Sequence, residues 1–71
     1  MQEIQVTDVV AILVDLPERG LRRGQVGTVV ESLGSDAFEI EFADEQGRTY
    51  ATAAVRTGQL MRLIHAPSQV A

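Results

Sequence analysis

Polar and apolar residues alternate most regularly over residues 37–43. Because side chains of a strand point alternately to its two faces, this pattern predicts a strand with one apolar face and one acidic face. The apolar face carries Phe38, Ile40 and Phe42, and the acidic face carries Glu39 and Glu41. We expect Glu41 to pair with Arg48, which follows the next turn.

A continuous apolar run over residues 9–14 ends near Leu16 and is followed by Pro17. Its valine and isoleucine content and the proline stop favour a strand over a buried helix. Apolar residues occupy both faces of this strand, so we expect the second face to be covered by a loop of the same chain or by a second copy. Val9 and Leu13 lie on one face, and Val10, Ile12 and Val14 on the other.

Three more strands and three turns complete the predicted elements. The strands cover residues 25–33, 48–55 and 60–64, tight turns cover Gly34–Asp36 and Asp44–Gly47, and a single turn of 3-10 helix covers Arg56–Gln59. The alanine-rich part of residues 48–55 also permits a short helix, which is the alternative for that segment.

A basic loop leads into the second of these strands, within the stretch Glu18–Val30. It carries Arg19, Arg22 and Arg23, together with Gly20, Gly24 and Gly27. Gly20 and Gly24 permit the positive φ of tight turns. Gly27 lies inside a strand, where glycine indicates a bulge, a sharp bend or a close approach of backbone. Leu21 is apolar within a polar loop, and we expect it to plug one end of the core.

Five short strands, one long loop and a 3-10 turn before the last strand predict an all-β fold, a small five-stranded SH3-like barrel. The alternative is a barrel of the oligonucleotide-binding type, but residues 44–47 leave no room for its usual helix between strands three and four. A chain of 71 residues forms one domain. We expect residues 1–7 to be a polar lead-in and residues 65–71 a flexible tail.

Composition narrows the function. The formal net charge is −4 and the chain has no lysine, which argues against a general polyanion-binding surface. There is no cysteine and one histidine, so no thiolate or multi-histidine metal site is expected. No segment approaches the ~18 apolar residues of a membrane span, and the polar start is unlike a signal peptide, so a cytoplasmic protein is expected.

Groups that could carry out catalysis are scattered. Glu39 and Glu41 share a strand face, but no pocket or nucleophile accompanies them. Asp36, Asp44 and Glu45 fall in turns and lack the ligand spacing of a calcium loop. We therefore expect no catalytic residue, no metal and no cofactor, and a protein that is not an enzyme.

The basic loop is the strongest candidate for function. Guanidinium groups bind carboxylates and phosphates through paired hydrogen bonds, and an aromatic ring can anchor a partner. The predicted partner-binding surface contains Arg19, Leu21, Arg22, Arg23, Arg48 and Tyr50. A protein partner, or a homo-oligomer, is favoured over nucleic acid, and neither a membrane nor a small-molecule substrate is indicated.

Six segments carry a resemblance: Asp8–Ala11, Leu16–Leu21, Gly24–Glu31, Ile40–Phe42, Gly47–Thr49 and Gln59–Leu60. Together they resemble a bacterial family of small proteins catalogued as domain of unknown function 4926. The resemblance implies an SH3-like barrel and an accessory, immunity or antitoxin-like role. Residues 23–31 also resemble the KOW motif of ribosomal and transcription-factor barrels, which implies nucleic-acid binding as the alternative function.

Overall fold

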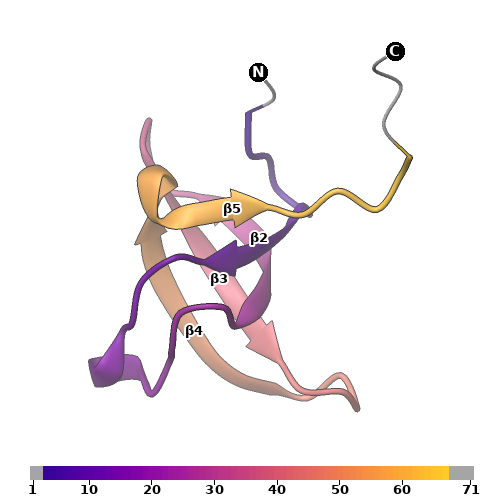
Figure 1. The fold of residues 1–71 in the computed structure, drawn as a ribbon. Helices are drawn as coiled ribbons and strands as arrows, with labels where there is room; N and C mark the ends of the chain where they lie inside the picture. The colour runs from indigo at the N-terminus through magenta and orange to yellow at the C-terminus, as the bar shows by residue number, and fades with distance from the viewer. Residues whose placement is uncertain (1–2, 68–71) are drawn as a thin grey trace.

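The computed structural model describes residues 3–67, and all of its strands belong to one antiparallel sheet (Figure 1). The strands are β1 (Val9–Ile12), β2 (Val26–Ser32), β3 (Ala37–Ala43), β4 (Thr49–Arg56) and β5 (Leu60–Arg62). Two single turns of 3-10 helix accompany them: η1 (Pro17–Arg19) lies between β1 and β2, and η2 (Thr57–Gln59) precedes β5. This element order confirms the all-β class and the 3-10 turn before the last strand.

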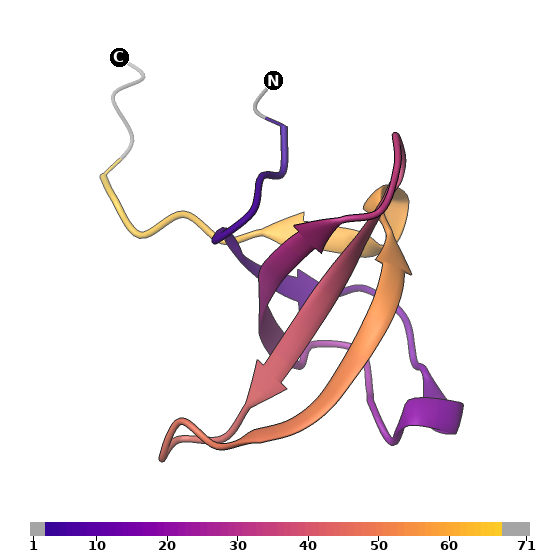
Figure 2. The same ribbon diagram turned by 180° about the vertical axis from the view of Figure 1, so that it is seen from behind.

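The sheet folds over on itself, so that β1 and β5 lie across β3 and β4 (Figures 1 and 2). The strand order is β4-β3-β2-β1-β5. β2 links the two halves, because its first residues pair with β1 and its later residues pair with β3. β4 and β5 are the sheet edges, and within residues 3–67 no ladder joins them. The sheet is therefore not closed into a continuous barrel.

Two irregularities of register bend the sheet. Val30 in β2 and Tyr50 in β4 are each an extra residue opposite two consecutive residues of β3. Such bulges kink a strand and increase its twist. They help a sheet of five short strands to wrap around its core.

Gly27 allows the two halves of the sheet to approach closely. A Cβ at this position would lie 2.6 Å from Cγ2 of Ile40 and 2.9 Å from the backbone oxygen of Glu41. The φ of Gly27 is not in the left-handed region, and the residue pairs with Val10 in β1. A glycine is therefore required at this position because the neighbouring atoms leave no room for a Cβ. This is the close approach of backbone that was one of the predicted reasons for a glycine here.

The core lies between the two halves of the folded sheet. Its members are Val10, Ile12, Leu21, Val29, Ile40, Phe42, Ala53, Val55 and Leu60. The predicted inward residues Ile40 and Phe42 are fully buried, and Phe38 packs against the cluster while remaining partly exposed. No polar or charged side chain within residues 3–67 is buried, so the core is held together by apolar contacts.

Strand β1 is buried on one face and partly covered on the other. Val10 and Ile12 are 0% exposed, and Ala11, which points to the opposite face, is 7% exposed. The chain itself therefore covers part of the second face, while Leu13, on that same face, remains 39% exposed. The strand ends at Ile12, two residues before the end of the apolar run, and just beyond it the Leu13 N–H donates to the Gln59 carbonyl at 2.8 Å.

The predicted pairing of Glu41 with Arg48 is wrong. Glu41 lies opposite Thr28 and Thr52 in the middle of the sheet. Arg48 instead pairs with Asp44 inside the hairpin, with 3.4 Å between Nε and Oδ2. Arg48 lies opposite Asp44 at the hairpin, where the Asp44 N–H donates to its carbonyl at 2.9 Å, whereas Glu41 lies three residues further along β3.

Other predicted boundaries differ by one or two residues. The alternative helix over residues 48–55 is wrong, because β4 occupies that segment, and β5 ends at Arg62 rather than at residue 64. Part of the lead-in is attached to the fold, since the Thr7 N–H donates to the Val29 carbonyl at 2.7 Å. Residues 1–2, and residues 68–71 of the predicted tail, lie outside the described residues. Within residues 3–67, no helix has the length and apolar character needed to cross a bilayer.

Candidate binding surface

The loop between β1 and β2, residues 13–25, is fixed by hydrogen bonds across its base. The Leu16 N–H donates to the Leu21 carbonyl at 2.9 Å, and the Leu21 N–H donates back to the Leu16 carbonyl at 3.0 Å. Between them η1 makes one turn and ends at Gly20, whose φ is 68°. This bridge places Leu21 in the core and leaves Arg19 exposed.

Leu21 was predicted both as a core plug and as a partner contact. The first prediction is confirmed, because its side chain is 1% exposed and belongs to the core cluster. A side chain this buried offers no surface to a partner. Leu21 therefore anchors the loop to the core and does not contact a partner.

The second half of the loop is a tight turn over residues 22–25. The Gln25 N–H donates to the Arg22 carbonyl at 3.1 Å, and Gly24 has a φ of 97°. A positive φ at the third residue of such a turn favours glycine strongly, as the sequence predicts. The Arg23 N–H donates to Oδ1 of Asp15 at 2.8 Å. The backbone that carries Arg22 and Arg23 is therefore held in place, while both side chains are exposed.

Gln25 joins this turn to strand β4. Its Oε1 accepts a hydrogen bond from the Arg22 N–H at 2.6 Å, and its Nε2 donates to the Tyr50 hydroxyl at 3.0 Å. Tyr50 is 49% exposed, and its ring lies 6.4 Å from that of Phe42, centroid to centroid. The structure thus places the predicted aromatic residue beside the arginine-bearing turn.

The six arginines divide into two groups. Arg48 pairs with Asp44, and Arg62 pairs with Asp8 at 3.1 Å, so these two have carboxylate partners within the fold. In the part of the chain that the structure describes, no carboxylate forms an ion pair with Arg19, Arg22, Arg23 or Arg56. Three of these four lie in the β1–β2 loop.

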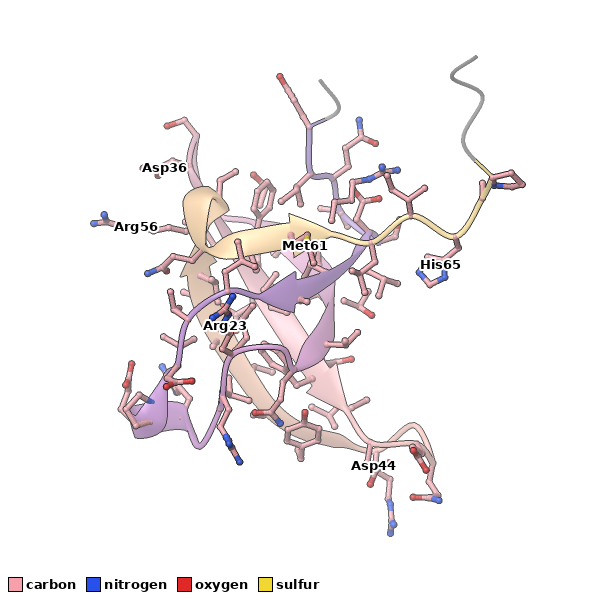
Figure 3. The ribbon with its side chains drawn as sticks, in the orientation of Figure 1. Arg23, Asp36, Asp44, Arg56, Met61 and His65 are labelled. Atoms are coloured by element: carbon pink, nitrogen blue, oxygen red, sulfur yellow. The ribbon has the colours of Figure 1, made fainter. Side chains whose placement is uncertain are left out.

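Arg48 does not join the loop residues. It lies at the β3–β4 hairpin, whose tip is well separated from η1 in both orientations of the ribbon (Figures 1 and 2). Figure 3 shows the same separation between Asp44, at the hairpin, and Arg23, at the loop. We define the arginine loop surface as Arg19, Arg22, Arg23, Gln25 and Tyr50.

Gln25 is the residue of this surface that the sequence analysis missed. It lies 25 residues from Tyr50, and no local pattern distinguishes it from the polar residues that precede other strands. The fold of the sheet brings the two side chains together, with Tyr50 at the bulge of β4.

Two other surface features carry less chemical information. An open groove lined by Ile4, Phe38, Leu60 and Met61 has one acidic and one basic residue at its rim, Glu3 and Arg62, so it has no net charge preference. Within residues 3–67, no three His, Cys, Asp or Glu side chains gather closely enough to hold a metal ion. The arginine loop surface is the feature with a clear chemical preference.

Comparison with protein families gives one match. The family model described as Domain of unknown function (DUF4926) matches residues 6–62, which is well over half of the chain. The chain belongs to the DUF4926 family. The match runs from the residue before Thr7 to the last residue of β5, so the DUF4926 region contains the whole sheet and the arginine loop surface. Searches of curated proteins and of solved structures found no match.

Proposed function

We propose that this DUF4926 protein is a non-enzymatic binding module that engages an acidic segment of a partner protein through the arginine loop surface. The carrying observation is that Arg19, Arg22 and Arg23 have no carboxylate partner within residues 3–67, although the chain as a whole has a formal charge of −4. Three guanidinium groups without carboxylate partners in one loop of an acidic protein offer a localised site for an anionic partner.

The rigidity of the loop supports this proposal. The Leu16–Leu21 bridge and the turn over residues 22–25 hold its backbone before any partner arrives. A preorganised surface loses less conformational entropy on binding than a mobile loop does. Tyr50 adds a partly exposed ring with a polar tip, which suits a residue that anchors a partner.

The proposed architecture is an SH3-like barrel with an incomplete seam. Five short strands in the order β4-β3-β2-β1-β5, a long β1–β2 loop and a 3-10 turn before β5 support it. In this arrangement the arginine loop surface lies at one end of the folded sheet. An accessory, immunity or antitoxin-like role is part of the same proposal, and the identity of the captured partner tests it.

A differential pull-down tests the function. Tagged wild-type protein is exposed to a lysate of the organism that encodes it, beside two charge-matched variants, Arg22→Ala/Arg23→Ala and Arg48→Ala/Arg56→Ala. All four residues are exposed, so both variants are expected to fold. We expect one protein to be retained by the wild type and by the second variant and lost from the first. Equal retention by both variants, or capture of nothing, overturns the proposal.

Nucleic-acid binding is the second candidate function. It is favoured by one observation, which is that a partly exposed aromatic ring lies beside arginines that lack carboxylate partners. A KOW-like barrel would bind nucleic acid with an affinity that falls as salt rises, and the salt dependence would weaken in Arg22→Ala. Capture that disappears after nuclease treatment would favour this function over the first.

A further inference from the structure

The hydrogen bonds around Gln25 have a fixed direction. A backbone N–H can only donate, so the oxygen of the Gln25 amide must face the Arg22 N–H, at 2.6 Å. The amide nitrogen must then face the Tyr50 hydroxyl, at 3.0 Å. Gln25 consequently donates to Tyr50, and the phenol oxygen is the acceptor in that bond.

The proton of the Tyr50 hydroxyl is therefore left for another acceptor. Within residues 3–67, no group accepts a hydrogen bond from this hydroxyl. Tyr50 is 49% exposed, so the hydroxyl is accessible to a ligand. A phenol that already accepts a hydrogen bond also becomes a better donor, because hydrogen bonds in a chain polarise one another.

The arginine loop surface thus offers donors, and the Asp15 carboxylate beside it accepts from the Arg23 backbone N–H at 2.8 Å without forming an ion pair with the guanidinium groups. The Gln25 amide joins the Tyr50 hydroxyl to the backbone N–H of Arg22, whose exposed side chain carries a guanidinium without a carboxylate partner within residues 3–67. A ligand that satisfies both must supply acceptor oxygens with negative charge. The side-chain carboxylate of Asp or Glu has this chemistry and forms short, charge-assisted hydrogen bonds with both kinds of donor.

We propose that the Tyr50 hydroxyl donates a hydrogen bond to a carboxylate of the acidic partner segment, beside Arg22, and that Gln25 is the positioning residue that directs the hydroxyl proton outward. This inference rests on the proposed function and names the group that the surface recognises. The expected ligand is a glutamate- or aspartate-rich segment of a protein.

Peptide titrations test the donor. The probe is N-acetylated hexaglutamate, with hexaglutamine as the neutral control, and binding is followed by two-dimensional amide NMR of the full chain. We expect the wild type to bind hexaglutamate with shifts at residues 22–25 and 50. Tyr50→Phe keeps the ring against Phe42 and should weaken binding by about tenfold, the cost of losing a hydrogen bond to a charged acceptor.

A second substitution tests the direction of the proton. In Gln25→Glu, one carboxylate oxygen accepts from the Arg22 N–H and the other accepts from the Tyr50 O–H, so the hydroxyl proton turns inward. The new charge also weakens binding, but that effect is independent of Tyr50. Tyr50→Phe should therefore cost about tenfold in the wild type and nothing measurable in the Gln25→Glu background.

The outcomes separate this inference from the proposed function. If Tyr50→Phe binds hexaglutamate as tightly as the wild type while Arg22→Ala/Arg23→Ala does not bind, the inference fails and the function stands. If Tyr50→Phe costs the same in both backgrounds, Gln25 has no positioning role. If the wild type does not bind hexaglutamate, or binds oligo(dT) instead through Tyr50, the carboxylate ligand is refuted.

Discussion

Gly27→Ala is the substitution for which the structure makes the sharpest stability prediction. Gly27 lies in β2 opposite Val10, and of the six glycines it is the one where an added Cβ would meet neighbouring atoms within 4 Å. A Cβ would lie 2.6 Å from Cγ2 of Ile40, 2.9 Å from the backbone oxygen of Glu41 and 3.0 Å from Cδ2 of Phe42. All three distances are much shorter than the ~3.5–4.0 Å at which carbon atoms make favourable contacts.

The neighbours cannot simply move aside. Cγ2 of Ile40 belongs to a fully buried, β-branched side chain, and the Glu41 oxygen is part of the backbone of β3. Overpacking of a core costs about 1–3 kcal/mol, and displacement of backbone puts this site near the upper limit. In a domain of this size, each 1 kcal/mol lowers the melting temperature by about 4–8 °C. We expect Gly27→Ala to lose about 3 kcal/mol and to melt roughly 12–24 °C below the wild type.

Gly58→Ala is the matched control. Gly58 lies in η2, and a Cβ there meets no atom within 4 Å. The control should remain within about 0.5 kcal/mol of the wild type, or be slightly more stable because alanine restricts the unfolded chain. Urea unfolding followed by circular dichroism measures both. Unfolding midpoints that coincide for the two variants would refute the packing argument for Gly27.

Three further predictions concern stability and use the same assay. Thr7 has a φ of 81°, which is strained for a β-branched residue, so Thr7→Gly should stabilise the protein by about 1 kcal/mol, and a loss of stability would contradict this. Asp8 accepts from the Gln5 N–H at 2.8 Å and from Nε of Arg62 at 3.1 Å, so Asp8→Ala should lower the free energy of unfolding by about 1–2 kcal/mol. An unchanged free energy of unfolding would show that these hydrogen bonds do not stabilise the fold. Leu21→Ala should cost about 2–5 kcal/mol through a core cavity, and a surface-like cost below 0.5 kcal/mol would show that the loop does not plug the core.

The elements that the sequence predicted well are those with strong local signals. The bounds of β3 are the predicted residues 37–43, because a period-two pattern flanked by Gly and Asp turns leaves little freedom. The hairpin over residues 44–47 follows from Asp44, whose Oδ1 accepts from the N–H groups of Gln46 and Arg48. These contacts join residues at most four positions apart, so the local sequence is enough to predict them.

The features that the sequence could not supply depend on contacts between distant segments. No glycine or other turn residue in the sequence marks the bulges at Val30 and Tyr50. They arise where the sheet bends around its core. The contact of Leu13, just after β1, with the carbonyl of Gln59 joins segments far apart in the chain. The hydrogen bond from Gln25 to Tyr50 joins residues 25 positions apart, so this part of the arginine loop surface appears only in three dimensions.

Net charge illustrates the same distinction for function. Judged from composition alone, a formal charge of −4 and the absence of lysine argue against anion binding. Binding depends instead on which charges are neutralised where, since exposed charges beyond about 10 Å are largely screened at 0.1 M salt. The fold neutralises Arg48 and Arg62 with Asp44 and Asp8 and leaves the loop arginines without carboxylate partners within residues 3–67. Local pairing, and not the total charge, therefore makes an anionic partner plausible for an acidic protein.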